Sequence, residues 1–487
     1  MSQIAEVFAN YKIEDHLLDE VFADEERVNP YYEDIYTHFS HLSPEDFKLL
    51  NEYAKLSFLN QGITYSVYSD NNKGTERIFP FDLFPRVIPA DQWSHIEKGI
   101  LQRNIAMNEF IKDIYSDQKI LKDKIVPSEL IFSSSNYCEE MVGVQPVGGI
   151  FCHICGTDII RHSDGEYYVL EDNLRCPSGV SYVLSNRVAM KRTLAKIFQD
   201  CQVRTVAEYP VELLAMLQSV ASEKIEFPTC VVLTPGIYNS AYYEHSFLAQ
   251  SMGIELVEGS DLFVENNCVY MKTIFGPKKV DVIYRRIDDA FLDPLVFNPK
   301  SLLGVPGLVS AYRSGNVTLV NAPGTGVSDD KAVYSYVPEI IKYYLGEDAI
   351  LKNVPTYLCE RENERKYVLD NIPNLVVKPV DQSGGYGVTI GHTLSKAQIE
   401  ELKEKIKENP REYIAQPIMR LTVHSTFIED QEVFEPRHID LRTFTLLGRN
   451  KNYVLQGGLS RVALRKGSLI VNSSQGGGSK DTWVVEN

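Results

Sequence analysis

The sequence predicts an α/β (α+β) protein with more than one domain, and three observations lead to this fold class. The first 125 residues or so are mainly helical in pattern, with apolar residues recurring at helical spacing. Residues 227–300 alternate short apolar strands with a helix, an order typical of a parallel sheet with right-handed crossovers. From about residue 331 to the end, a helix is followed by several β segments and a further helix.

Length and charge limit the functions that the chain can have. Its 487 residues are enough for about three domains. The net charge of −17 disfavours nucleic acid and anionic membranes as partners, so an anionic ligand needs a local basic site or a metal ion. The N-terminus lacks the pattern of a signal peptide, and no apolar run approaches the ~20 residues of a membrane span. Eight scattered cysteines suit a reducing compartment, and we expect a cytoplasmic protein.

Several helices carry recognisable start and stop signals. One begins at Pro44, directly after Ser43 as its N-cap, and ends at Gly62. A second begins near Asp91, which we expect to cap it, and spaces its apolar residues for one face. In the alternating region, the helix between the strands "FPTCVVLTPG" and "IELV" closes at Gly253.

The pair Asp164-Gly165 lies between two apolar runs and predicts a β-hairpin, because a type I′ turn needs positive φ at both central residues. With these two residues as the turn, paired positions sum to 329 and Asp158 lies directly opposite Glu171. Their Cβ atoms would then be ~4.5–5.5 Å apart. Asn173, two residues beyond Glu171, lies on the same face of the sheet.

Three oxygen-bearing side chains at one point suggest a hard cation, because opposed like charges destabilise a sheet. Carboxylate and amide oxygens suit Mg²⁺, which keeps places for water and nucleotide phosphates. The alternative is a solvated hairpin end whose acids point outward. Cys152 and Cys155 form an isolated CxxC pair, which is a weak zinc signal beside the simpler interpretation as buried thiols.

A lysine and a glycine-rich loop offer a site for phosphate. Lys378 lies on a short apolar strand, and Gly384, Gly385, Tyr386 and Gly387 precede the next strand. Glycines let backbone N–H groups approach a polyphosphate closely, although a plain hairpin is the default interpretation of such a turn. The order strand–loop–strand differs from that of a P-loop, and no P-loop motif occurs in the chain.

Two helix starts offer further anion sites. Lys331 opens a helix, where its charge opposes the helix dipole; either a bound phosphate or simple exposure to solvent explains it. Arg175 and Ser178 lie in a tight loop just before another helix, and a helix N-terminus beside an arginine suits an anion. Ser178 as a simple N-cap is an equally good interpretation, and the two roles are compatible.

With these pieces placed, the sequence resembles the circularly permuted ATP-grasp proteins of type 2, which are related to glutathionylspermidine synthase. The resemblance covers most of the chain, and segments that carry it include "FPFDLFPRVIPADQW", "GTDIIRHSDGEYYVLEDNLRCPSGVSYVLSNR", "VNAPGTGVSDDKAV", "VVKPVDQSGGYGV", "HIDLRTFTLLG" and "VNSSQGGGSKDTWV". It implies a circularly permuted ATP-grasp fold, in which the E-x-N of Glu171 and Asn173 precedes the lysine strand by some 200 residues instead of following it.

The resemblance also implies four parts of the chain. They are an N-terminal mainly helical region (1–135), the metal-ligand hairpin with its following helix (136–226), a Rossmann-like pre-ATP-grasp domain (227–330) and the ATP-binding lobes (331–487).

Carried over by motif, the resemblance assigns roles to individual residues. Mg²⁺ would be held by Asp158, Glu171 and Asn173. ATP would be contacted by Lys331, Lys378, Ser383, Gly384, Gly385, Tyr386, Gly387 and, beside the adenine, Gln416. The transferred phosphate would be stabilised by Arg442 and Arg461, and the acceptor carboxylate bound by Arg175 and Ser178. A structural ion pair is the alternative for each arginine, because arginine beside acids on a strand is commonly structural.

The activity implied is that of an ATP- and Mg²⁺-dependent carboxylate–amine ligase that works through an acyl phosphate on a small-molecule or peptide acid and an amine. Such chemistry needs positioning and charge neutralisation rather than a protein nucleophile, and no GxSxG elbow or Cys/His pairing stands out. Two alternatives stay open: an ATP-dependent phosphotransferase, and a non-catalytic nucleotide-binding regulatory protein. The sequence identifies neither the two substrates nor an oligomeric state.

Overall fold

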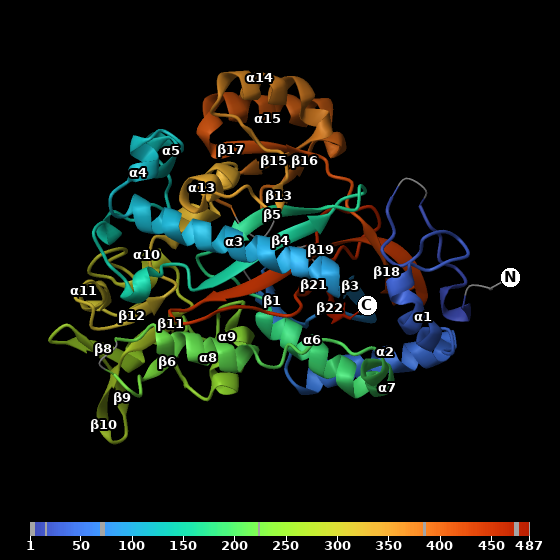
Figure 1. The fold of residues 1–487 in the computed structure, drawn as a ribbon, viewed down its shortest axis with the longest axis horizontal. Helices are drawn as coiled ribbons and strands as arrows, with labels where there is room; N and C mark the ends of the chain where they lie inside the picture. The colour runs from blue at the N-terminus through green and yellow to red at the C-terminus, as the bar shows by residue number, and fades with distance from the viewer. Residues whose placement is uncertain are drawn as a thin grey trace.

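Figure 1 shows a mixed helix-and-sheet molecule, with a large sheet between an upper lobe and a lobe at the lower left. The computed structural model describes residues 5–14, 17–68, 74–222, 225–382, 386–471 and 477–486. Among these residues, no helix is both long and apolar enough to cross a membrane.

The large sheet, or main sheet, joins strands from both ends of the chain. Its order is β13-β5-β4-β19-β21-β22-β3, and β18 and β20 also pair with β19. β3 runs parallel to β22, so a strand of the N-terminal region pairs with a strand near the C-terminus. The bounds are β3 Phe81–Pro89, β4 Ile154–Arg161, β5 Tyr167–Asn173, β13 Lys352–Asn353, β18 Val423–Ile428, β19 Val433–Leu447, β20 Asn452–Val454, β21 Leu459–Val462 and β22 Gly478–Val485.

Helix α3 (Ala90–Ile114) covers one face of the main sheet (Figure 1). Trp93 of this helix and Ile159 of β4 belong to the same apolar cluster. Because side chains alternate along a strand, the next residue, Asp158, points to the opposite face. Asp158 therefore lies on the face of the sheet away from α3.

The hairpin of β4 and β5 differs from its prediction at the turn and agrees with it farther down. The turn has three residues instead of two, because His162 N donates to Glu166 O at 2.9 Å and Gly165 alone supplies positive φ, at 87°. Pairing near the turn is therefore shifted by one, with Ile159 opposite Val169. A β-bulge restores the predicted register two positions later.

The N-terminal region is mainly helical, as expected, but it also contributes strands. Ser43 caps α2 and forms a capping box with Asp46, which confirms the prediction. Asp91 lies in the first turn of α3 and does not cap it, because the N-cap is Pro89. The bounds are α1 Glu33–Phe39, α2 Pro44–Asn60, β1 Thr64–Tyr68, β2 Gly74–Ile78, α4 Lys119–Lys122 and α5 Ser128–Phe132.

The lower-left lobe contains the parallel sheet that the alternating pattern predicts. Its order is β12-β11-β6-β7, with all neighbours parallel. Gly253 ends α9 in the left-handed conformation, as predicted. The bounds from α6 onward are α6 Val180–Thr193, α7 Ala195–Asp200, α8 Tyr209–Ser219, β6 Cys230–Leu233, α9 Tyr242–Met252, β7 Glu255–Val257, β8 Leu262–Glu265, β9 Cys268–Thr273, β10 Gly276–Val280, β11 Val282–Arg285, α10 Asp289–Leu292, α11 Leu308–Arg313 and β12 Thr318–Val320.

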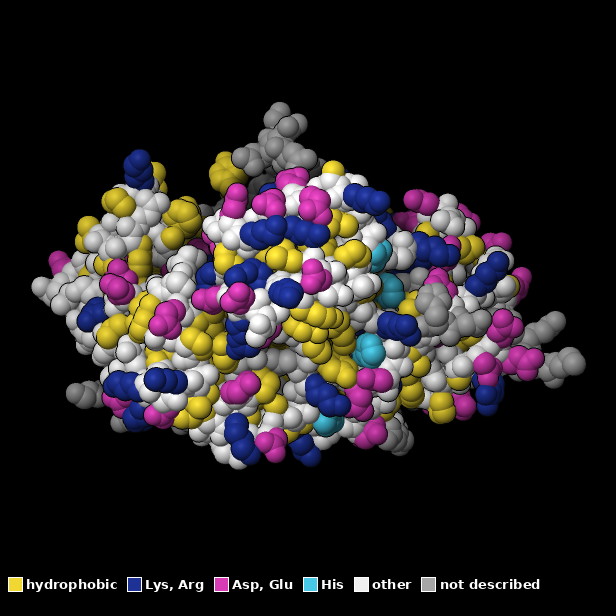
Figure 2. Space-filling view, turned by 90° about the horizontal axis from the view of Figure 1, so that it is seen from above, with side chains coloured by type: hydrophobic (Ala, Val, Ile, Leu, Met, Phe, Trp, Pro, Cys, Tyr) yellow, Lys and Arg dark blue, Asp and Glu magenta, His cyan; other side chains and the backbone are white. Residues whose placement is uncertain are grey.

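The upper lobe is a sheet of order β14-β17-β15-β16 covered by α14 and α15 (Figure 1). One apolar cluster joins the two layers, with Val377 and Ala415 from the sheet and Val368 and Ile406 from the helices. Seen from above in Figure 2, Lys and Arg are interspersed with Asp and Glu. The bounds are α12 Lys331–Tyr334, α13 Val337–Leu345, β14 Tyr357–Leu358, α14 Glu362–Asn371, β15 Leu375–Pro379, β16 Thr389–Ile390, α15 Lys396–Glu408 and β17 Tyr413–Pro417. The domain boundaries at residues 135, 226 and 330 stay a prediction.

Candidate functional site

A cleft lies between the main sheet and the sheet of the upper lobe. Its walls bring together predicted site residues from segments far apart in the sequence. Those that line it are Glu171 of β5, Lys331 of α12, Lys378 of β15, Gln416 of β17 and Arg461 of β21.

Much of the remaining cleft wall is apolar. An apolar slot that continues into a charged end can hold a flat ring attached to a polyanionic chain. The apolar lining residues are Ile160, Leu170, Val354, Val376, Val388, Ile390, Pro417, Met419, Leu421, Leu469, Ile470 and Val471.

Lys378 is held in the cleft by a short chain of hydrogen bonds. Its Nζ donates to Gln416 Oε1 at 2.7 Å, and Gln416 Nε2 donates to Thr356 Oγ1 at 3.0 Å. The Thr356 hydroxyl in turn donates to Val354 O at 2.9 Å. Burial lowers the pKa of Lys378 to about 8, although the nearby Glu171 carboxylate opposes this effect. The ammonium group of Lys378 is thus hydrogen-bonded to a neutral amide, which suits it to an anionic ligand.

Lys331 is buried at the start of α12. Only 8 % of the residue is exposed, so the interpretation that it is simply solvated is wrong. Its Nζ donates to Gln382 O, and Asp330 caps the helix by accepting from Ala332 N. Both cleft lysines lie near Glu171. The Glu171 carboxylate raises the pKa of Lys378, and the Lys331 charge lowers the pKa of Glu171, each against the larger effect of burial.

Asp158 and Glu171 face each other across β4 and β5, as predicted. Asp158 is fully buried and accepts from Arg442 Nε at 2.6 Å, from Arg442 Nη2 at 2.7 Å and from Arg461 Nη2 at 2.7 Å. Arg461 also pairs with Asp440, its Nε lying 2.9 Å from Oδ1. These residues form an arginine–carboxylate cluster: Asp158, Glu171, Asp440, Arg442 and Arg461.

The cluster shifts the acidity of its members in opposite directions. Burial would raise the pKa of Asp158, but Arg442 and Arg461 outweigh it and hold that pKa below its ordinary value. The pKa of Glu171 is raised, chiefly by burial and then by the Asp158 charge. The paired arginines therefore explain how two opposed carboxylates persist in a sheet.

The donor atoms fit a divalent cation in part. Glu171 keeps 21 % of its side chain exposed and lines the cleft. The side-chain nitrogen of Asn173 is buried without a hydrogen-bond partner, but an amide nitrogen does not ligate a cation, so only the amide oxygen could serve. Both oxygens of Asp158 already accept from guanidinium groups, so any cation would share them. Among the described residues, no group of three His, Cys, Asp or Glu side chains is placed to hold a metal ion.

The helix start near Ser178 differs from its interpretation as a helix capped by Ser178. The N-cap of α6 is Gly179, and the carboxylate of Glu244 accepts from Gly179 N at 2.7 Å and from Ser181 N at 3.1 Å. A side chain of the protein thus occupies the predicted anion position. The Ser178 hydroxyl contacts Arg286 Nη2, and the structural role as N-cap is wrong.

Arg175 makes the structural ion pair that was its alternative, with Nη1 3.1 Å from Asp288 Oδ2. The pair is half-buried. Neither Arg175 nor Asp288 is among the described residues that line the cleft. Arg175 and Ser178 as ligands of an acceptor carboxylate stay a prediction.

The glycine-rich loop is described in part. Ser383, Gly384 and Gly385 lie outside the described residues. Tyr386 is half-exposed, and Gly387 has φ of 70° with Pro379 so close that a Cβ would lie 2.8 Å from its ring. A glycine is therefore required where the loop returns toward the lysine strand.

The CxxC pair is buried, as the simpler interpretation has it. Cys152, His153 and Cys155 are each 0 % exposed. Burial raises the pKa of both thiols, which disfavours the thiolate that zinc requires.

Asp440 is a site residue that sequence reasoning missed. It lines the cleft and holds Arg461. A signal existed in "HIDLRTF", where Asp440 lies two residues before Arg442 on the same strand and so shares its face.

Comparison with known proteins adds a family to this geometry. Residues 85–463 match the sequence profile of the family described as circularly permuted ATP-grasp type 2. The chain belongs to this permuted ATP-grasp family. The fold class expected from the sequence is thereby confirmed, including the early position of the Glu171 hairpin relative to the Lys378 strand.

Relatives within and around the permuted ATP-grasp family match almost the whole chain. An uncharacterized protein of Synechocystis sp. is 51% identical over 96% of this chain and 97% of its own length. An uncharacterized protein of Mycobacterium tuberculosis is 48% identical over 98% of this chain and 86% of its own. A protein of Frankia casuarinae, provisionally named glutamate–cysteine ligase 2-2, is 39% identical over 96% of this chain and 53% of its own.

A solved structure supports the fold. The glutathione synthetase-like effector of Globodera pallida, in its apo form, superposes with a TM-score of 0.57 at 12% identity. The match covers 91% of this chain and 98% of the effector. At 12% identity, the similarity to the effector concerns the fold alone.

Proposed function

We propose that the protein is an ATP- and Mg²⁺-dependent carboxylate–amine ligase that forms an acyl phosphate on its acid substrate. One observation carries the proposal: Lys331 of α12, Lys378 of the upper-lobe sheet, and Glu171 and Arg461 of the main sheet converge on a single cleft. Membership of the ATP-grasp family and the provisional name of the Frankia relative support ligase chemistry.

The charge balance of the cleft suits a triphosphate. Among the lining side chains, Lys331, Lys378 and Arg461 supply three cations against the carboxylates of Glu171 and Asp440, in a chain whose net charge is −17. This is the local basic site that an anionic ligand needs in an acidic protein. The apolar slot next to it takes the adenine, with Gln416 at its edge.

Glu171 and Asn173, with a shared oxygen of Asp158, would hold Mg²⁺. When bound, the ion neutralises phosphate charge and orients the terminal phosphoryl group. Arg461 and Arg442 would then face the charge that develops on the transferred phosphoryl group. Lys331, Lys378 and the glycine loop would contact the phosphates, as the family resemblance implies.

The reaction follows from positioning. An oxygen of the acid substrate attacks the γ-phosphorus, the bond to the β-phosphate oxygen breaks, and ADP leaves with the cleft lysines near its charge. The amine then attacks the acyl carbon, loses a proton and displaces phosphate. No protein nucleophile is required, and exclusion of water from the cleft protects the acyl phosphate.

The test is ATP turnover against panels of acids and amines, with the product identified by mass spectrometry. An amide together with ADP and phosphate supports the ligase, whereas a stable phosphorylated product identifies a phosphotransferase. MgATP binding without turnover on any panel member identifies a regulatory protein. Glu171→Gln is the control, and turnover equal to that of the parent would contradict the assigned site.

A further inference from the structure

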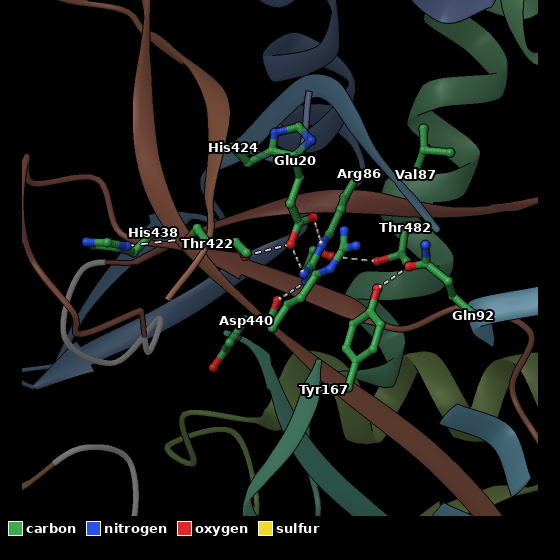
Figure 3. Close-up of polar contacts among 12 residues, drawn as sticks. Glu20, Arg86, Val87, Gln92, Tyr167, Thr422, His424, His438, Asp440 and Thr482 are labelled. Atoms are coloured by element: carbon green, nitrogen blue, oxygen red, sulfur yellow. Dashed lines mark hydrogen bonds and ion pairs between the residues drawn. The ribbon is translucent and has the colours of Figure 1, made fainter. Parts of the chain in front are cut away.

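Glu20 and Arg86 form a buried ion pair behind the cleft. The two side chains are 2 % and 0 % exposed. Arg86 Nε lies 2.7 Å from Glu20 Oε2, and Arg86 Nη2 lies 2.6 Å from Glu20 Oε1, which is a bidentate pairing. Figure 3 shows Glu20 pointing from the N-terminal segment toward Arg86 of β3.

Glu20 makes further hydrogen bonds besides those to Arg86. Its Oε1 also accepts from Thr422 Oγ1 at 2.6 Å. Its backbone N donates to Val423 O at 2.9 Å, which ties the N-terminal segment to β18. Burial would raise the pKa of Glu20, but the Arg86 charge outweighs it and the pKa is lowered, so the pair is ionic.

The third donor of Arg86 reaches the strand that carries the site. Arg86 Nη1 donates to the backbone oxygen of Asp440 at 3.0 Å (Figure 3). The side chain of Asp440 holds Arg461, whose Nη2 lies 2.7 Å from Asp158 Oδ2. One continuous series of contacts therefore runs from Glu20 to the arginine that lines the cleft.

Stability alone does not account for this pair. Buried ion pairs are often no more stabilising than well-packed apolar residues of similar volume, because both charges lose their hydration. A second buried pair, Asp82 and Lys480, lies in the same part of the main sheet at 2.8 Å. Its other hydrogen bonds go to backbone atoms of β3 and β18.

We propose that Arg86, held by Glu20, is a positioning residue for Arg461 and acts through Asp440. This inference rests on the proposed function. It also gives a role to the segment around Glu20, which precedes the family match that begins at residue 85. The segment would be part of the support of the site rather than an appendage to it.

The experiment compares two matched double variants of the full chain. Glu20→Gln/Arg86→Met removes both charges of the pair and keeps an acceptor for Thr422. Asp82→Asn/Lys480→Met makes the same change in the neighbouring pair. Each variant is crystallised for the position of Arg461, and its affinity for MgATP is measured by calorimetry.

We expect the Glu20/Arg86 variant to move Arg461 out of hydrogen-bond distance of Asp158 and to weaken MgATP binding about tenfold, the effect of one charge-assisted hydrogen bond. The Asp82/Lys480 variant should keep both properties. Equal affinity in the two variants, with Arg461 in its parent position, would overturn the proposal.

A milder variant covers the case in which the double variant does not fold. Arg86→Lys retains the charge beside Glu20 but lacks the guanidinium nitrogen, Nη1, that donates to Asp440 O. It should show a smaller displacement of Arg461 and a loss of affinity of about threefold, and an unmoved Arg461 would count against the proposal. If the parent itself binds no MgATP, the proposed function fails, while the crystal structures still decide whether Arg86 positions Arg461.

Discussion

Lys378 Nζ lies 2.7 Å from Gln416 Oε1, and the orientation of that amide is set by a residue outside the predicted site. The hydroxyl of Thr356 gives its proton to Val354 O, so its oxygen accepts from Gln416 Nε2. The carbonyl end of Gln416 is therefore turned toward the lysine. A single threonine decides which end of the glutamine Lys378 meets.

Thr356→Val should weaken MgATP binding by about threefold to tenfold. Valine has the shape of threonine but cannot accept from Gln416, and one hydrogen bond is worth roughly 0.5–1.5 kcal/mol. Calorimetry measures the affinity, with Thr393→Val, at an exposed position, as the control. Unchanged affinity would show that the amide keeps its orientation without Thr356.

Lys378→Met should lower MgATP affinity more strongly, by about tenfold to a hundredfold. The variant retains the buried stem but removes the cation that the proposed function places on a phosphate. Lys396→Met, at the exposed start of α15, changes the net charge equally and should bind as the parent does. Equal losses in both variants would indicate a general charge effect instead of a contact.

Asp19→Asn should flatten the dependence of stability on pH. Burial raises the pKa of Asp19 to about 6, although Tyr11 and the backbone N–H groups of Val21 and Phe22 oppose it. The folded protein therefore holds a proton that the unfolded chain releases between about pH 4 and 6, and stability falls as the pH rises through this range.

The asparagine variant lacks this titration. The difference between its free energy of unfolding and that of the parent should therefore increase, in favour of the variant, by roughly 1 kcal/mol or more between pH 5 and 8. Urea denaturation at several pH values measures the difference. Asp370→Asn, an exposed substitution, should follow the parent at every pH. A parent profile parallel to that of Asp19→Asn would mean that Asp19 is ionised throughout.

Glu244→Gln should destabilise the fold by about 3–5 kcal/mol, because it leaves Arg286 as a buried charge without its partner. The same carboxylate accepts from the first N–H groups of α6, where a negative charge is favoured by the helix dipole. Thermal denaturation measures the effect, and Glu400→Gln on the surface of α15 should change it by less than about 1 kcal/mol. A loss as small as that of the control would contradict the capping role.

Local patterns predicted the parts of the site that depend on sequence spacing. The opposition of Asp158 and Glu171 was predicted from a two-residue turn, and it holds because the bulge offsets the additional turn residue. Lys378 followed from its place on an apolar strand. Contacts between distant segments had no such signal. The pairing of β3 with β22, the capping of α6 by Glu244 and the reach of Arg86 to Asp440 each join residues that only the folded chain brings together.

The three-residue turn at Gly165 and the bulge at Leu170 compensate each other. The turn puts the two strands out of phase by one position, and the additional residue brings them back into phase before Glu171 is reached. Relatives can therefore change the length of the hairpin tip by one residue, provided that they lose or gain the bulge at the same time. What natural variants of this hairpin must conserve is the sum of the two irregularities, since that sum alone keeps the acidic pair aligned.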